Sequence, residues 1–225
     1  MKLKWMAVFG VGLVAAQLSA QEPAGLKTQK DRTSYALGMD LANSLKKQSI
    51  DVDPALFSQG LRDVLGSSKT LLTEEEVRTI LAALQAEVRN NMTAKIKQDG
   101  AAFLAQNKAK DGVVTLPSGL QYKILKAGDG KKPGLDDTVV CHYKGTLIDG
   151  TEFDSSYKRN QPATFPVKGV IKGWTEALQL MPVGSQWQLV IPSDLAYGDR
   201  GAANVIPPYS TLVFEVELVS IQTKP

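Results

Sequence analysis

Hydrophobic residues in the first half of the chain recur at helical spacing. Within residues 31–48, most of them stand three or four positions apart, at Tyr35, Leu37, Leu41, Ala42 and Leu45. This pattern predicts an amphipathic helix. A second helix is predicted after Asp53, a favoured N-cap residue, because Pro54 suits the first helical position. Its hydrophobic side carries Leu56, Phe57, Leu61, Val64 and Leu65, and the Gly-Ser-Ser of residues 66–68 ends it.

A third, much longer helix is predicted from residue 74. Thr73 and Glu76 have the spacing of a capping box, and no proline follows until Pro117. A helix over residues 74–111 would have 38 residues and a length of about 57 Å. Its hydrophobic stripe is dense in the first half and sparse in the second. We therefore expect the second half to leave its packing partner and project as a shaft, with Gly100 as a weak point.

The helices before residue 74, together with half of the long one, would form only a thin core. Pairing with a second copy of the chain would enlarge that core. Met39 and Met92 could supply adaptable packing at such an interface, or they could fill a core within one chain. The small size of the core favours a homodimer.

From residue 112 the pattern changes from helical spacing to alternation. Strands are predicted over residues 120–126, 138–144, 186–191 and 211–221. In the last strand, Leu212, Phe214, Val216 and Leu218 share one face, with Glu215 and Glu217 opposite. Asp149-Gly150 predicts a hairpin turn, and a short helix is expected over residues 174–180. Strands with one short helix imply an α+β fold, an antiparallel sheet curled around that helix.

The first twenty residues have the pattern of a secretory signal peptide. Lys2 and Lys4 precede a hydrophobic run over residues 5–16, which is too short to span a bilayer, and small residues lead to a cleavage site after Ala20 or Ala16. The alternative is a buried N-terminal helix. We thus expect four regions: signal peptide 1–20, helical dimerisation region 21–73, connecting helix 74–111 and β-rich domain 112–225.

Charge and rare residues exclude several kinds of function. The 225-residue chain has 26 Lys and Arg against 23 Asp and Glu, a net charge of +3 that falls to +1 when Lys2 and Lys4 are cleaved off. This charge does not indicate nucleic-acid binding. A single Cys and a single His exclude a thiolate or multi-histidine metal site, and nothing in the sequence calls for a cofactor.

Cys141 and His142 are the only possible thiol–imidazole pair. They are neighbours on a predicted strand, so their side chains point to opposite faces and cannot form a catalytic dyad. No G-x-S-x-G motif accompanies His142, which argues against a serine hydrolase. We expect Cys141 to be a small buried hydrophobe and His142 to lie at the surface.

Aromatic residues are spread singly along the β-rich region, where they would ordinarily form its core. However, the surrounding strings are distinctive: V-x-H-Y-x-G at 140–145, G-x-x-F-D-S-S at 150–156, V-I-x-G-W at 170–174, A-Y-G at 196–198 and I-P-P-x-x-T-L-x-F at 206–214. With these five ordered motifs, residues 112–222 resemble an FKBP-type peptidyl-prolyl cis-trans isomerase. The preceding signal peptide and helices resemble the Mip/FkpA subgroup, dimeric isomerases of the bacterial periplasm or cell surface.

The resemblance implies a half-barrel sheet wrapped over a short helix, and a substrate pocket. Catalytic positions would be Tyr143, Phe153, Asp154, Trp174, Tyr197 and Phe214, and substrate-binding positions Phe165, Val170, Ile171 and Ile206. Trp174 would form the floor under the proline ring. The Tyr197 hydroxyl and the Ile171 N–H would hold substrate carbonyls, and Asp154 would act through hydrogen bonding and its field rather than as a base. The chain departs from the family pattern at Val167, where an aromatic is common, and at residues 202–204.

The resemblance implies an isomerase that assists the folding of exported proteins, with unfolded proline-containing chains as substrates and FK-class macrolides as inhibitors. Rotation about X–Pro needs no nucleophile or metal, because an apolar pocket already favours the less polar twisted amide. The alternative is a holdase chaperone that uses the same domain only to grip clients. We expect a periplasmic location, with the cell surface and secretion left open.

Overall fold

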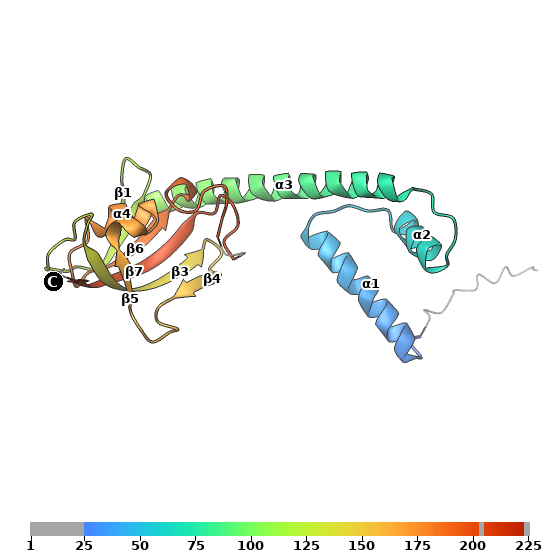
Figure 1. Ribbon diagram of the computed structural model, residues 1–225, viewed down its shortest axis with the longest axis horizontal. Coiled ribbons are helices and arrows are strands. Elements are labelled where there is room, and N and C mark those ends of the chain that lie inside the picture. The colour runs from blue at the N-terminus through green and yellow to red at the C-terminus, as the bar shows by residue number, and fades with distance from the viewer. Residues whose placement is uncertain (1–24, 203–204, 223–225) are drawn as a thin grey trace, which may run out of the picture. The chain divides into compact units, whose positions relative to one another are not determined.

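The computed structural model describes residues 25–202 and 205–222. The predicted signal peptide, residues 1–20, lies outside these residues. The chain divides into two compact units, residues 1–70 and residues 71–225, and each is described by itself (Figure 1). The described part of the first unit contains two helices, and that of the second contains a long helix and an antiparallel sheet, so the predicted α+β class is confirmed.

The two helices of the first unit begin where their caps predict. Helix α1 spans Gln29–Lys47 and starts at a capping box between Thr28 and Asp31, two residues earlier than expected. Helix α2 spans Pro54–Leu65, and the Asp53 carboxylate accepts the N–H groups of the next turn. Within the described part of the chain neither helix has a buried residue. The side chains of Leu37 and Leu65 remain 65% and 83% exposed.

Helix α3 spans Glu74–Lys108, a continuous helix of 35 residues (Figure 1). The predicted capping box between Thr73 and Glu76 is present. The predicted end at residue 111 is wrong by three residues. After Lys108 the backbone tightens into turns, with Lys110 N–H donating to the Asn107 carbonyl, and Gly112 (φ +74°) turns the chain into the first strand.

The second half of α3 packs against the β-rich region, so it is not the free shaft that the sequence predicted. Gly100 and Asn107 are buried on this half. The Asn107 amide donates to Gln121 Oε1 (2.9 Å), and the Gln121 amide donates to the Leu104 carbonyl (2.9 Å). Gly100 faces Thr211 so closely that an added Cβ would lie 2.7 Å from Thr211 Oγ1. The helix docks through a glycine and two amides, which produce no hydrophobic stripe, so Gly100 is a contact rather than a weak point.

The sheet of the second unit is antiparallel throughout. Its strands are β1 Val113–Thr115, β2 Gln121–Lys126, β3 Thr138–Leu147, β4 Glu152–Ser155, β5 Ala163–Pro166, β6 Gln186–Ile191 and β7 Leu212–Gln222. Their order is β1-β2-β6-β7-β3-β4, and β5 also pairs with β3. The longest ladder joins β3 to β7 and shifts register at Val140 and Cys141. The four predicted strands are confirmed, whereas β1, β4 and β5 are too short to show clear alternation.

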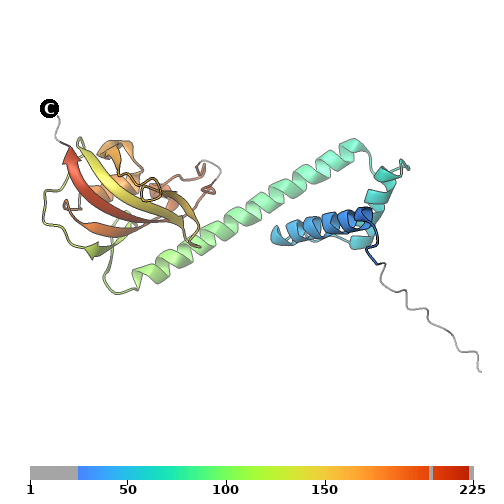
Figure 2. The ribbon, with the colours of Figure 1, turned by 90° about the horizontal axis from the view of Figure 1, so that it is seen from below.

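The sheet curves around the short helix α4, Lys172–Leu178, which starts two residues earlier than predicted (Figure 2). Trp174, Ala177 and Leu178 of α4 pack into the core. The inward face of β7 is the predicted one, since Leu212, Phe214, Val216 and Leu218 are all buried. The turn between β3 and β4 is the expected hairpin, with Gly150 at φ +87°.

Cys141 and His142 lie on opposite faces of β3, as predicted. Cys141 is fully buried, and this burial raises the pKa of its thiol to about 12. His142 is half-buried rather than exposed. Its ring stacks on Tyr157 with a centroid distance of 4.9 Å, and its Nδ1 lies 3.0 Å from Ser156 Oγ. Cys141 and His142 therefore do not form a nucleophilic dyad.

The described residues contain neither a helix suited to a membrane nor a cluster of metal ligands. None of their helices is both long enough and apolar enough to cross a membrane. Their His, Cys, Asp and Glu side chains form no group of three that could hold a metal ion.

Candidate active site

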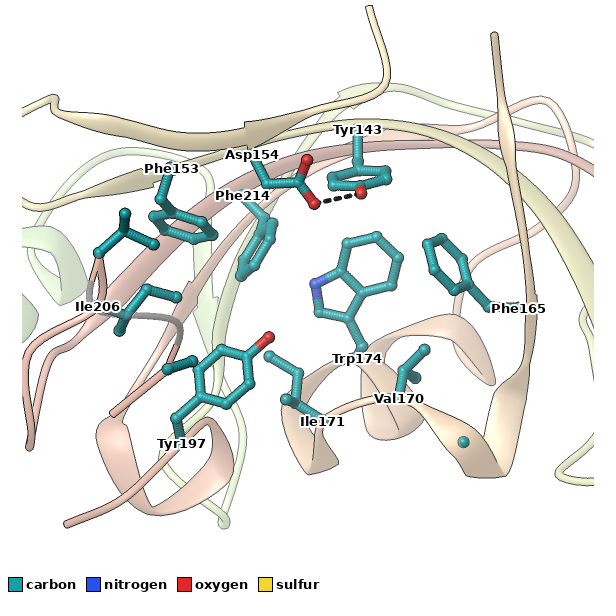
Figure 3. Close-up of a pocket in the computed structure, with 13 residues that line it drawn as sticks. Tyr143, Phe153, Asp154, Phe165, Val170, Ile171, Trp174, Tyr197, Ile206 and Phe214 are labelled. Carbon is teal, nitrogen blue, oxygen red and sulfur yellow. Dashed lines mark hydrogen bonds between the residues drawn. The ribbon is translucent and has the colours of Figure 1, made fainter. Parts of the chain in front are cut away.

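A pocket of about 510 Å³ opens between the concave side of the sheet and α4 (Figure 3). All ten residues named from the sequence line this pocket. Gly169, Ala202 and Val205 also line it and were not predicted as site residues. Val167 does not line it but lies fully buried in the core. Ala203 and Asn204 of the other predicted departure lie outside the described residues.

The fold gathers the lining from segments far apart in the chain. Tyr143 comes from β3, Phe153 and Asp154 from β4, Phe165 from β5 and Phe214 from β7. Val170 and Ile171 come just before α4, whose first turn carries Trp174. Tyr197 and Ile206 belong to the long loop between β6 and β7. Side chains separated by as many as 71 positions therefore meet because the sheet closes around α4.

Trp174 forms the floor of the pocket inside an aromatic cage. Its ring makes edge-to-face contacts with Tyr143 at 5.3 Å, Phe165 at 5.6 Å and Phe214 at 5.3 Å between centroids. Only 4% of the residue is exposed, and the indole N–H is buried without a hydrogen-bond acceptor. Figure 3 shows the indole nitrogen on the side of the ring that faces Phe214.

Gly145 on β3 makes room for the opposite wall of the pocket. An added Cβ would lie 2.6 Å from Phe153 Cε2 and 2.7 Å from Phe214 Cε1. These two rings meet edge to face, with centroids 5.5 Å apart. Because a carbon atom needs about 3.5–4.0 Å to its neighbours, only glycine permits this approach. Steric fit thus explains why the motif at 140–145 ends in glycine.

A polar triad borders the pocket. The Tyr143 hydroxyl donates to the Asp154 carboxylate, and Arg159 donates to both, with Nη2 2.8 Å from Tyr143 Oη. Partial burial acts to raise the pKa of Asp154, but the hydrogen bonds from Tyr143 and Arg159 and the Arg159 charge outweigh it, so the net pKa is lowered. Burial and the bond to Asp154 raise the pKa of Tyr143. Arg159 was not predicted, although a cation five positions after Asp154 is a visible signal.

Two lining residues, Tyr197 and Ile171, each carry a hydrogen-bond donor that has no partner among the described residues. The Tyr197 hydroxyl points into the pocket (Figure 3), and within the described residues it makes no hydrogen bond. Burial and the negative charge of Asp154 raise the pKa of Tyr197, so the hydroxyl keeps its proton at neutral pH. Ile171 is the N-cap of α4, and the first N–H groups of a helix have no acceptor inside the helix.

Comparison with known families bears directly on this arrangement. A family model described as FKBP-type peptidyl-prolyl cis-trans isomerase matches residues 129–219, and a model for the domain amino-terminal to it matches residues 30–124. The outer membrane protein MIP of Legionella longbeachae is 45% identical over 229 residues, covering 99% of this chain and 98% of that protein.

The chain belongs to the FKBP-type peptidyl-prolyl cis-trans isomerases. It is therefore an enzyme that accelerates rotation about the peptide bond before proline. A protein named peptidyl-prolyl cis-trans isomerase Mip, from Coxiella burnetii, is 44% identical and is matched over the full length of both chains. The crystal structure of FkpA from Escherichia coli is 39% identical with a TM-score of 0.67, covering 88% of this chain and 99% of that one. The FKBP fold and activity predicted from the motifs are thus confirmed.

Proposed function

We propose that the pocket between the sheet and α4 binds an X–Pro segment and catalyses its rotation without covalent chemistry. The observation that best supports this proposal is the apolar aromatic floor at Trp174. The Tyr197 hydroxyl and the Ile171 N–H, which have no partner among the described residues, border this floor. Twisting the amide must overcome a barrier of about 18–20 kcal/mol, because it breaks the resonance of the C–N bond. A twisted amide is less polar than a planar one, so an apolar pocket favours the transition state over the ground state.

The aromatic rings and the two donors then have distinct roles. The proline ring lies on Trp174, between the side chains of Phe165, Phe153 and Phe214. Tyr197 Oη and the Ile171 N–H donate to the carbonyls on either side of the rotating bond, which holds them while the amide twists. Lowering the barrier by about 5 kcal/mol would accelerate rotation several thousandfold.

Asp154 contributes its fixed negative charge rather than proton transfer. A general base works best with a pKa near the operating pH. The hydrogen bonds of the triad lower the pKa of Asp154 and so move it away from that range. The carboxylate, held by Tyr143 and Arg159, instead sets the field at the rim where the substrate carbonyl rotates.

The test is a cis–trans relaxation assay on a proline-containing peptide, paired with refolding of a protein limited by proline isomerisation. We expect the full chain to accelerate both reactions, and Asp154→Ala and Tyr197→Phe each to lower kcat/KM. An FK-class macrolide should compete for the same pocket. A wild-type chain that leaves both rates at the buffer value would refute the proposed mechanism.

We also propose that the chain works as a homodimer joined through its helical region. The exposed hydrophobic side chains of α1 and α2 support this, because a patch of that kind needs a cover in water. Sedimentation should give twice the mass of one chain. Leu61→Asp, on α2, should shift the mass to that of a monomer, whereas Ser58→Asp, which adds the same charge at a polar position of α2, should not.

The proposed place of action is the bacterial cell envelope, after export, where the enzyme assists the folding of exported proteins. The basic start and short hydrophobic run of residues 1–20 support export, as does the name outer membrane protein of the Legionella longbeachae relative. N-terminal sequencing of the mature protein should begin at residue 21 or 17. Recovery of the uncleaved chain from the cytoplasm would contradict export.

A further inference from the structure

Helix α3 contacts the end of the loop between β6 and β7, next to β7 and outside the site described above. The ammonium of Lys97 lies 3.8 Å from the centroid of the Tyr209 ring. One helical turn later, Gly100 packs against the Thr211 side chain. The loop that leads into β7 lies beside α3 in Figure 1. The amide pair of Asn107 and Gln121 anchors the end of α3 to β2, so Lys97 extends from a backbone that is itself held in place.

Tyr209 is connected to the two parts of this loop that line the pocket, near Tyr197 and near Ile206. Its N–H donates to the Gly198 carbonyl at 2.7 Å, and Gly198 directly follows Tyr197. In the other direction only Pro207 and Pro208 separate Tyr209 from Ile206, and proline fixes its φ angle. A displacement of Tyr209 is therefore passed to Tyr197 through one hydrogen bond and to Ile206 through a stiff spacer.

The backbone of Tyr209 also needs outside support. Its φ of +63° lies in the left-handed region, which a bulky residue adopts only where its surroundings hold it. The Ser210 hydroxyl donates to the Pro207 carbonyl (2.8 Å) and closes the turn from one side. On the side of α3, the Lys97 ammonium lies over the Tyr209 ring.

We propose that Lys97 is a positioning residue for the isomerase reaction: through Tyr209 it holds Tyr197 and Ile206 where the substrate needs them. The proposal rests on the role proposed for Tyr197 and on the substrate-binding position expected of Ile206, which lines the pocket. Helix α3 is then a working part of the catalytic unit as well as a connection to the first unit. A single cation–π contact at an exposed site limits the effect of its removal to about two- to fivefold in kcat/KM.

The test uses the full chain in the peptide isomerase assay. Lys97→Met keeps the aliphatic stem and removes the charge, and should lower kcat/KM about two- to fivefold. Lys97→Arg restores a cation over the ring and should keep most of the activity. Lys95→Met is the matched control, because the Lys95 ammonium pairs with Asp99 on the exposed surface of the same helix, and it should be silent.

A second measurement separates positioning from a general effect on the fold. In a Tyr209→Leu background, Lys97→Met should cause no additional loss, because the two residues act through one contact. Thermal midpoints of Lys97→Met and Lys95→Met should agree. If the wild type is active and Lys97→Met is equally active, the positioning proposal is wrong and the proposed function stands. The same conclusion follows if Lys95→Met loses as much activity as Lys97→Met. An inactive wild type would refute the proposed function itself, and this proposal with it.

Discussion

Gly145→Ala is the sharpest test of how the pocket wall is built. The substitution adds one carbon to β3 at a point where two pocket rings converge. That carbon would lie 2.6 Å from Phe153 Cε2, 2.7 Å from Phe153 Cζ and 2.7 Å from Phe214 Cε1. Carbon atoms in contact are about 3.5–4.0 Å apart, so one or both rings must move by about 1 Å. The rings of Phe153 and Phe214 pack against each other and both line the pocket, so their movement changes the site directly.

Two energies with opposite signs decide the effect on stability. Replacing glycine by alanine restricts the unfolded chain, which stabilises a protein by about 0.4–1 kcal/mol where the backbone is compatible. Overpacking of this kind costs about 1–3 kcal/mol. The overpacking is larger, so we expect a net loss of stability and a fall in the melting temperature of a few degrees, at about 2–4 °C for each kcal/mol. A misplacement of about 1 Å at the reacting centre can cost about a hundredfold in rate, so we expect kcat/KM to fall about ten- to hundredfold.

The assay is cis–trans relaxation of a proline-containing peptide, with thermal unfolding measured on the same samples. Gly134→Ala is the matched control, because its new Cβ would meet only Asp137 Oδ2 at an ordinary 3.6 Å. This control should keep the activity of the wild type. A Gly145→Ala variant with unchanged kcat/KM and melting temperature would refute the steric account of the wall.

Three further predictions concern the charged and titratable groups. Arg159→Met should lower kcat/KM about three- to tenfold in the peptide assay, and Arg159→Lys should not restore it, because one ammonium cannot replace the two guanidinium bonds to Asp154 and Tyr143. The lowered pKa of Asp154 means that its ionised form stabilises the fold above about pH 4, and that this contribution is lost as the pH falls through the folded pKa. In urea unfolding, the stability difference between wild type and Asp154→Asn should therefore shrink from pH 7 to pH 3, and a constant difference would contradict the assignment. Cys141, buried and with a pKa of about 12, should react with a thiol reagent at pH 8 only as fast as its unit unfolds, so rapid labelling of the native protein would count against its burial.

The sequence signals that correctly predicted helix starts and a strand face each involve only a few neighbouring residues. Asp53 and Pro54 mark the start of α2, because a cap binds N–H groups two and three positions away. The alternation in β7 marks its buried face, because side chains of a strand point to opposite sides by geometry alone. By contrast, β4 and β5 have four residues each and were not recognised, since so few positions do not establish a period.

Ten of the thirteen lining residues of the candidate site were predicted through family resemblance rather than through periodicity. Burial alone would have assigned Trp174 and Phe214 to the core, and both are indeed buried. A residue in a pocket wall differs from a core residue because one side of its side chain faces empty space instead of other protein atoms. A sequence pattern does not show this difference. Arg159 was missed for a related reason: its role depends on a loop folding back over Asp154 and Tyr143.

By itself, the sequence determined where α2 and α3 begin, which face of β7 is buried, and which family the β-rich region resembles. These properties depend on short-range geometry or on ordered motifs. Only the tertiary structure decided that α3 docks through Gly100 and Asn107, that Gly145 makes room for two rings, and that Lys97 reaches Tyr209. Each of these contacts depends on a small or polar residue, namely Gly100, Asn107, Gly145 or Lys97. Such groups are brought together by closure of the sheet around α4 and by the docking of one helix, and they produce no hydrophobic period that a sequence could display.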